Sequence, residues 1–317
     1  MTLPLFEPPV PPFRAKLAES LGRLAAEGVY IGTSSWKYPG WMEQIYTPER
    51  YRVRGRFSKR LFEDTCLAEY AETFPVVCGD FSFYQFPSEH YWRKLFGTAP
   101  APLRFAFKVP EEITVKVFPM HERYGARAGL ENESFLSATV VEEMLLKPLE
   151  PYQDRVAALI FEFGTFPRHV LGVDAFLERL DGFLRALPPR FRYSVEVRNP
   201  EFLGPEYFGC LRQQNVAHVF NAWARMPELG TQIAIPGAFT ADFTVTRALL
   251  RQGRAYEQAV RLFQPYLEVK EENPAARQAL RDLIGRARTT RQPAFVFVNN
   301  RLEGNAPQTI SAIVEEE

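Results

Sequence analysis

The stretch RYSVEVRNP, Arg192 to Pro200, combines a β-prone run with two charged side chains near its end. Alternation along a strand places Ser194, Glu196 and Arg198 on one face. Pro200 ends the run, because proline cannot continue a sheet ladder and also restricts the residue before it. A carboxylate and a guanidinium at the end of a buried strand are costly without partners. This strand end is therefore the first place to look for a functional site.

Short β-prone runs like this one alternate along the chain with segments of helical period. The predicted strands are Val29–Ser34, Val76–Phe83, Arg104–Val109, Ala157–Phe163, Arg192–Val197, Ala217–Asn221, Ala241–Arg247 and Ala294–Asn299. Each connection is long enough for a crossover helix, which favours parallel pairing. Eight such strands predict a single α/β domain with a TIM-type (β/α)8 barrel. A doubly wound open sheet is the structural alternative.

The segments between these runs predict helices and a simple domain organisation. Helical patterns cover Lys59–Phe74, Glu133–Leu146, Val173–Leu187, Tyr207–Gln214, Tyr256–Val269 and Ala275–Arg288. Residues 1–28 form a proline-rich N-terminal arm and a leading helix, and residues 29–317 form the barrel domain. The charged, glycine-bearing segment Glu111–Glu131 predicts a long loop after the third strand.

Composition sets limits on the class of protein. The 317 residues are 46% hydrophobic, and 38 Lys and Arg balance 38 Asp and Glu. A formal net charge of zero gives no whole-chain attraction to nucleic acid or to an anionic membrane. Three scattered cysteines, no secretory signal and no membrane-spanning run predict a cytoplasmic protein without a membrane partner.

Polar and aromatic residues recur where the predicted strands stop. The carboxyl ends of barrel strands meet at one mouth, which is where barrel enzymes build their sites. We take Glu162 and Glu196 as candidate catalytic residues. The candidate substrate-binding residues are Trp36, Tyr38, Trp41, Asp80, Tyr84, Lys108, Arg198, Asn221, Arg247, Asn299, Asn300 and Arg301. Among these, the aromatic residues 36, 38 and 41 are expected to form a rim at the mouth.

The two glutamates allow two interpretations. Glu162 and Glu196 lie near the ends of adjacent strands and suit a carboxylate pair, one protonated and one ionised, as in glycoside hydrolysis. The structural alternative pairs Glu196 with Arg198, Lys108 or Arg247 as compensation for buried charge. For Glu196 taken alone, the structural alternative is favoured.

The cations at the strand ends indicate an anionic ligand. Lys108, Arg198, Arg247 and Arg301 suit a phosphate or carboxylate, which arginine grips with two hydrogen bonds. The pair Asn299-Asn300 adds amide groups suited to sugar hydroxyls or phosphate oxygens. The alternative for this pair is a role limited to ending the eighth strand and starting a turn.

Metal and cofactor sites have little support in the sequence. The four histidines show no HxH or HExxH spacing, and no GxGxxG, Walker or GxSxG pattern occurs. We therefore predict no metal and no cofactor. A Mg²⁺ ion held by Asp80, Glu162 and Glu196 stays open as an alternative.

Five segments also resemble the ordered motifs of a known family. They are IGTSSWKYPGW (Ile31–Trp41), FSFYQFP (Phe81–Pro87), FAFKVPEEIT (Phe105–Thr114), SVEVRNPEF (Ser194–Phe202) and VFVNNRLEGNAP (Val296–Pro307). Their order and content resemble the domain of unknown function 72 family, also called YecE-like. The resemblance implies a TIM-type barrel and no established activity.

This chain also departs from the family's pattern at three strand ends. Cys78 and Asp80 stand where the family usually has Glu and Asn, and Glu162 stands where it usually has Gln. The residues after Arg247 are Ala-Leu-Leu where the family usually has Leu, His and Gly. The resemblance therefore places the protein in a divergent branch.

Three classes of function follow from these observations. The first is a cofactor-independent hydrolase or lyase acting on a phosphorylated or sugar-containing small molecule. The second is a nucleic-acid-processing enzyme, in which cations contact phosphate and aromatic residues stack on bases; the zero net charge disfavours it. The third is a non-catalytic ligand-binding protein, because a barrel fold does not determine function.

Overall fold

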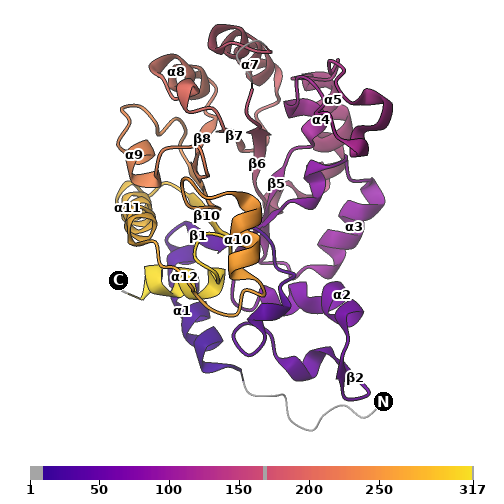
Figure 1. Cartoon of the computed structure of the whole chain (residues 1–317), viewed down its shortest axis with the longest axis vertical. Helices are drawn as coiled ribbons and strands as arrows, with labels where there is room; N and C mark the ends of the chain where they lie inside the picture. Colours follow the sequence, from indigo (N-terminus) through magenta and orange to yellow (C-terminus); the bar gives the residue numbers. More distant parts are fainter. Residues whose placement is uncertain (1–9, 167–169, 316–317) are drawn as a thin grey trace.

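The computed structural model describes residues 10–166 and 170–315. Eight parallel strands close into a barrel in the order β1-β10-β9-β8-β7-β6-β5-β4 (Figure 1). They are β1 (Val29–Thr33), β4 (Val76–Gly79), β5 (Arg104–Lys108), β6 (Val156–Phe163), β7 (Tyr193–Val197), β8 (Ala217–Ala222), β9 (Thr244–Ala248) and β10 (Ala294–Val298). The TIM-type barrel is confirmed, and closure excludes the open sheet.

The barrel closes between β1 and β4, where two strands approach unusually near. Gly32 pairs with Val76 in the parallel register. A Cβ on Gly32 would lie 1.8 Å from the carbonyl oxygen of Val76. Only glycine allows this approach, so residue 32 is a requirement of closure.

The helices cover the outside of the barrel. They are α1 (Pro12–Ala26), α2 (Lys59–Tyr70), α3 (Glu89–Thr98), α4 (Glu111–Thr114), α5 (Ala138–Val141), α6 (Lys147–Leu149), α7 (Val173–Ala186), α8 (Pro205–Gln213), α9 (Leu229–Ile233), α10 (Tyr256–Phe263), α11 (Pro274–Thr290) and α12 (Ala306–Val314). A π-helical stretch, Glu142–Leu146, joins α5 to α6. A short antiparallel hairpin, β2 (Arg52–Val53) and β3 (Arg56–Phe57), stands apart from the barrel sheet.

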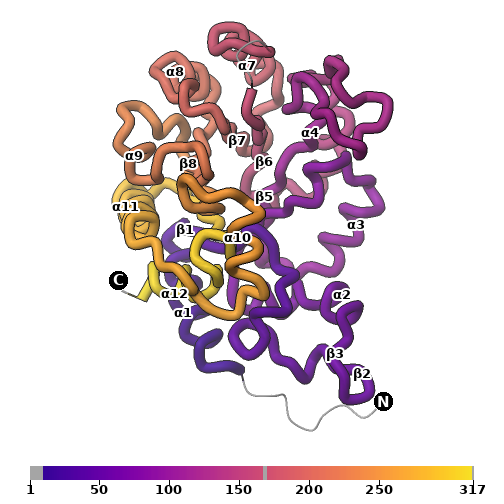
Figure 2. Tube along the Cα trace, in the orientation of Figure 1, coloured from indigo at the N-terminus to yellow at the C-terminus, as the bar shows by residue number. Residues whose placement is uncertain are grey.

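The first and last described helices lie side by side (Figure 2). Lys16 of α1 and Glu315, which follows α12, form an ion pair of 3.1 Å. The helix expected ahead of the first strand is α1. Residues 1–9 of the proline-rich arm lie outside the described residues.

Two predicted helices differ from the observed ones by five residues or more at an end. The segment predicted as Tyr256–Val269 is helical only to Phe263, because Pro265 lacks the amide hydrogen that a continuing helix needs. The segment predicted as Glu133–Leu146 begins its helix at Ala138. Its start is displaced because Ser137 caps the helix with its side chain.

The second predicted strand is also shorter than expected. It stops at Gly79, and Phe81–Phe83 form a 3-10 turn. The ring of Phe81 packs against Phe107 and Trp92, which turns the chain outward. The alternation of β4 therefore does not extend to Tyr84.

The long segment after β5 is a loop with short ordered pieces, close to expectation. It contains α4 and a 3-10 stretch, Glu122–Arg127. A bridge between Val117 and Glu131 ties its ends together, and the side chains of Lys116 and Glu131 form an ion pair across it. The loop is thus closed on itself by backbone and side-chain contacts.

Inside the barrel, alternate residues form an apolar layer below a charged one. The apolar layer includes Cys78, Ala106, Ile160, Val219 and Val245. Two positions further along the same strands lie the charged and amide side chains of the mouth, as strand alternation predicts. The apolar floor fixes the depth of the site.

Candidate functional site

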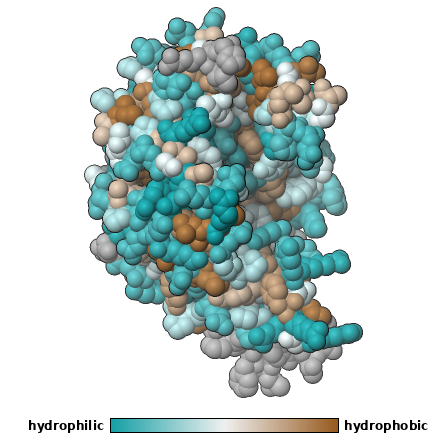
Figure 3. Space-filling view, in the orientation of Figure 1, coloured by the Kyte–Doolittle hydropathy of each residue, from teal (hydrophilic) through white to brown (hydrophobic). Residues whose placement is uncertain are grey.

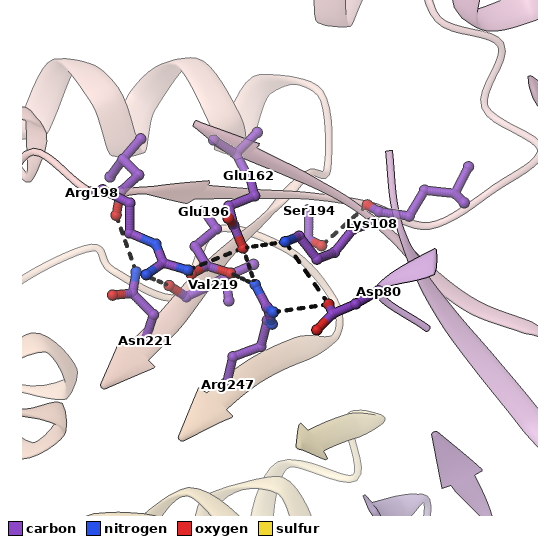
Figure 4. A network of polar contacts seen from close by, with 12 residues as sticks. Asp80, Lys108, Glu162, Ser194, Glu196, Arg198, Val219, Asn221 and Arg247 are labelled. Carbon is purple, nitrogen blue, oxygen red and sulfur yellow. Dashed lines mark hydrogen bonds and ion pairs between the residues drawn. The ribbon is translucent and has the colours of Figure 1, made fainter. Parts of the chain in front are cut away.

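Six charged side chains converge at the carboxyl ends of five strands (Figure 4). Each is carried there by the same alternation that lines the barrel interior. This charged cluster comprises Asp80 after β4, Lys108 of β5, Glu162 of β6, Glu196 and Arg198 at the end of β7, and Arg247 of β9. All six belong to the set chosen from the sequence.

Arg247 and Arg198 link the carboxylates of the charged cluster. The Nη1 atom of Arg247 lies 2.5 Å from Glu162 Oε2 and also bonds Glu196, while its Nη2 lies 3.5 Å from Asp80. The Nη2 atom of Arg198 lies 3.0 Å from Glu162 and 2.6 Å from Glu196. Two guanidinium groups thus bridge the two glutamates, which are register partners on β6 and β7.

Lys108 completes the charged cluster on its outer side. Its Nζ lies 3.1 Å from Glu162 Oε2 and 3.9 Å from Asp80. The same ammonium sits 3.6 Å from the centre of the Phe83 ring, within the range of a cation–π contact. Asp80 and Glu162 keep 42% and 14% of their side-chain surface exposed, whereas Glu196 is fully buried. Solvent therefore reaches the cluster from the Asp80 and Glu162 side.

The cluster contains three carboxylates and three cations. The cations determine the protonation state of Glu162. Burial alone raises the pKa of Glu162, but the positive charges of Arg198, Lys108 and Arg247 lower it well below its usual value. Burial lowers the pKa of Arg247, and the two glutamates raise it well above the ordinary arginine value. Glu162 is therefore ionised at neutral pH and can accept a proton but not donate one.

This result decides how the two glutamates are interpreted. A glycosidase pair needs one protonated carboxyl group to serve as the acid. The cluster holds Glu162 in its ionised form, so Glu162 does not supply that acid. Glu196 forms the ion pairs with Arg198 and Arg247 that the structural alternative expects. The structure therefore favours charge compensation over an acid and base pair.

Several buried polar atoms beside the charged cluster lack hydrogen-bond partners among the described residues. They are Nε and Nη1 of Arg198, Nε of Arg247, Oδ1 of Asn221 and Oε1 of Glu196, the last of which forms an ion pair with Arg198. Asn221 is held in place because its Nδ2 donates to the carbonyl oxygen of Val197 at 3.1 Å. The Arg198 guanidinium lies 3.7 Å from the centre of the Trp223 ring. Unpartnered buried donors are costly, so this corner is suited to a ligand that supplies acceptors.

The expected aromatic rim is only partly present. Trp41 is fully buried: its ring packs on Tyr46, and its Nε1 donates to Asn300 at 3.1 Å. The prediction that Trp41 faces the mouth is wrong, because the turn Pro39–Trp41 directs the indole into the core. Trp36 is nearly buried and Tyr38 half-buried.

Tyr84 lies apart from the charged cluster. It keeps 64% of its surface exposed, and the Arg123 guanidinium lies 5.3 Å from its ring centre. The observed 3-10 turn that ends the second strand separates it from Asp80. The structure therefore does not bring Tyr84 together with the six charged residues.

The segment after β10 serves mainly to build a turn. Asn299 Oδ1 accepts the amide of Arg301 at 2.9 Å, and Asn300 Oδ1 accepts the amide of Ala306 at 2.8 Å. The Arg301 guanidinium lies over the Tyr256 ring at 4.5 Å. The strand-ending alternative for Asn299 and Asn300 is the one that the hydrogen bonds support.

Metal-binding and thiol chemistry gain no support from the geometry. Across residues 10–166 and 170–315, no three His, Cys, Asp or Glu side chains are grouped so as to hold a metal ion. Asp80, Glu162 and Glu196 instead point at cations. Burial raises the pKa of Cys78 to about 12, which leaves an inert thiol.

Two residues at the site are absent from the set chosen from the sequence. Trp223 stacks on Arg198, and Phe83 lies under Lys108. Trp223 follows Asn221 by two positions, so alternation provides a signal for it. Phe83 has no such signal, because it reaches Lys108 from a turn rather than from a strand.

The described part of the chain contains no helix long and apolar enough to cross a membrane.

Comparison with known proteins supports the fold and the family. UPF0759 protein YecE of Escherichia coli strain K12 is 27% identical over 176 residues, 55% of this chain and 50% of that protein. The same values hold for the protein of that name in E. coli O157:H7. The chain thus spans about half the length of the curated relatives it matches.

Solved structures agree with the barrel. A DUF72 family protein from Thermotoga maritima has a TM-score of 0.58 at 18% identity, covering 91% of this chain and 98% of that one. A DUF72 family protein from Enterococcus faecalis has a TM-score of 0.57 at 15% identity, covering 91% and 96%. At these identities the likeness shows the fold alone. The family model described as "Protein of unknown function DUF72" matches residues 30–316, so the chain belongs to the DUF72 family.

Proposed function

We propose that the strand carboxyl ends bind a small molecule that carries an anionic group, a phosphate above all, next to hydroxyl groups. The proposal includes a cofactor-independent hydrolase or lyase activity on such a phosphorylated or sugar-containing ligand. One observation carries it. Arg198 is 5% exposed, yet its Nε and Nη1 have no partner among the described residues.

The guanidinium of Arg198 is prepared for an anion. Glu162 and Glu196 hold its Nη2, and Trp223 supports its plane. These contacts fix the orientation and leave two donors for the ligand. Nε and Nη1 lie on different edges of the guanidinium, so each can donate a separate charge-assisted hydrogen bond to an anionic oxygen of the ligand.

The neighbouring side chains supply the rest of the proposed site. Nε of Arg247 adds a donor, and Oδ1 of Asn221 is an acceptor suited to a ligand hydroxyl. Glu162, which is partly exposed, is the proton acceptor in this scheme. The cations that lower its pKa also make it a weak base. Glu196 is fully buried, so its role is to position Arg198 and Arg247 rather than to touch substrate.

Binding is tested by calorimetric titration with inorganic phosphate, glucose 6-phosphate and glucose. We expect the two phosphate compounds to bind and glucose to bind more weakly. Arg198→Gln should weaken phosphate binding about tenfold or more, the effect of losing a charged hydrogen bond of about 1.5–3 kcal/mol. Arg23→Gln, whose side chain is 67% exposed on α1, is the matched control and should bind as the wild type does. Equal binding by wild type and Arg198→Gln would contradict the proposed site.

Turnover is tested on a panel of sugar phosphates with wild type and Glu162→Gln. Retained binding with lost turnover in Glu162→Gln supports the enzyme. Phosphate binding without any turnover by the wild type supports a non-catalytic ligand-binding protein instead and removes the enzymatic part of the proposal.

A further inference from the structure

A second surface, remote from the charged cluster, stands out by its charge. The stretch RYRVRGRFSKR, residues 50–60, contains six cations and no Asp or Glu, in a chain whose formal net charge is zero. It spans the hairpin of β2 and β3, which lies at the periphery of the molecule in Figure 1. We call residues 50–60 the basic hairpin. Such a local concentration of charge attracts polyanions whatever the total charge.

Two of its cations have no carboxylate within ion-pair distance among the described residues: Arg54 and Arg56. Arg50 is in a short ion pair, 2.7 Å from Glu72. The other three are in long, exposed pairs: Arg52 with Glu49 at 3.7 Å, Lys59 with Glu63 at 3.7 Å and Arg60 with Asp64 at 3.8 Å. Exposed pairs of this length are weak and exchange readily with another anion. The charges of Arg54 and Arg56 are therefore available to a partner, and those of the three long pairs can be released to it.

The turn at the tip of the hairpin requires a backbone conformation that is unfavourable for arginine. Arg54 and Gly55 have φ values of 52° and 79°, the left-handed conformation that a two-residue type I′ turn requires at both positions. Glycine and asparagine adopt this conformation more readily than arginine does. A strained residue that places a cation at the very tip points to a use for that cation.

The base of the hairpin is firmly held, which presents its cations in one arrangement. Tyr51 is buried and accepts the amide of Ser58 at 2.8 Å. The ring of Phe57 lies 5.9 Å from that of Phe62 in the core. Val53 and Phe57 keep about half of their surface exposed. The lower right of the molecule, where Figure 1 labels β2, carries both hydrophilic and hydrophobic side chains in Figure 3.

We propose that the basic hairpin binds the phosphate backbone of a duplex nucleic acid. Five of its six cations are arginines, whose planar forks match phosphate oxygens. A two-stranded ribbon fits the width of a duplex groove. An anionic membrane is the less suitable partner, because the tip that would enter it is Arg54-Gly55 and the Phe57 ring packs back on the protein.

The test measures fluorescence anisotropy of a labelled DNA duplex of about 20 base pairs with the whole protein between about 50 and 200 mM NaCl. We expect salt-dependent binding by the wild type. The double variant Arg54→Gly, Arg56→Gln keeps a residue that favours the turn while removing two cations. Its affinity should fall about tenfold, and its slope of log affinity against log salt should fall by about 2, near 0.9 per phosphate contact.

The matched control removes two exposed cations from α3, Arg93→Gln with Lys94→Gln, and should bind as the wild type does. Thermal unfolding checks that both variants fold. The proposal is overturned by an absence of duplex binding at the lowest salt, by equal loss in the control, or by unchanged binding in the hairpin variant. Binding to phosphatidylserine vesicles but not to the duplex would also overturn it, in favour of a membrane. Since the hairpin variant leaves Arg198 intact, phosphate binding at the mouth is an independent readout.

Discussion

Two buried groups of ion pairs, one between α1 and α2 and one at the barrel mouth, differ in how completely their polar atoms are satisfied. Between α1 and α2, Arg14 and Glu69 are both 2% exposed and form an ion pair. Glu69 also accepts from Thr47 at 2.6 Å and Tyr51 at 2.6 Å, while Arg14 donates to the Ile45 carbonyl at 3.0 Å. No side-chain nitrogen or oxygen of Arg14 or Glu69 is among the buried atoms that lack a partner.

The charged cluster at the barrel mouth is fully buried at Glu196 and exposed to solvent at Asp80. Three of its arginine nitrogens have no partner among the described residues, and Asp80 is 42% exposed. A closed group of ion pairs has nothing left to bind, and its role is to join elements of the fold. An incomplete one holds donors in place at a cost in stability, which is the usual mark of a binding site.

Removing one partner of the fully satisfied Arg14–Glu69 ion pair should have the largest effect on stability. Glu69→Ala leaves Arg14 buried without its main counter-charge and should lower the free energy of unfolding by about 3–5 kcal/mol. Urea unfolding at neutral pH measures it. Glu72→Ala is the control: Glu72 pairs with the same Arg14 at 3.2 Å but is 43% exposed, so the loss should stay below about 1 kcal/mol. Similar losses of unfolding free energy in Glu69→Ala and Glu72→Ala would contradict the distinction between the buried and the exposed ion pair.

The open group should tolerate the loss of an arginine better. Arg198→Gln removes only one paired nitrogen, and Arg247 still neutralises Glu196. We expect a loss of about 1–2 kcal/mol in the free energy of unfolding, less than for Glu69→Ala. A loss as large as that of Glu69→Ala in the same urea experiment would mean that Arg198 is primarily structural.

Acid should reveal the ionised Glu162. Its pKa is lowered in the folded state, so its contribution to stability is complete above the ordinary carboxyl pKa and is lost as pH falls through the lower folded value. Unfolding free energies from about pH 7 down to about pH 3 should therefore fall less steeply in Glu162→Gln than in the wild type. Parallel pH profiles would show that Glu162 is not held in its charged form.

The smallest effect is expected at the exposed edge of the mouth. Asp80→Asn removes a carboxylate that lies 3.5 Å from Arg247 and 3.9 Å from Lys108. Its stability should change by less than about 1 kcal/mol. The cluster gains one net positive charge, so phosphate should bind about two- to fivefold more tightly by calorimetry. Weaker phosphate binding would indicate that Asp80 itself contacts the ligand.

Most of the charged residues at the barrel mouth could be predicted from the sequence because they lie on regular strands. Lys108, Glu162, Glu196 and Arg247 lie inside barrel strands, where alternation determines the face that each side chain occupies. Trp41 and Tyr84 come from turns, where alternation fails, and their expected places at the mouth were not found. The turn at Phe81–Phe83 also explains why Phe83 was missed.

The sequence by itself determined the eight strands, the barrel and the gathering of polar residues at one end, because these follow from local hydrophobic periodicity and from the rule that parallel strands share a carboxyl edge. Only the tertiary structure decided which charges neutralise one another. Arg247 meets Glu162 across 85 positions of the chain, and no local pattern encodes that contact. The protonation of Glu162 and the unpartnered nitrogens of Arg198 arise from that distant assembly, since both depend on which charges and acceptors surround a buried group in space.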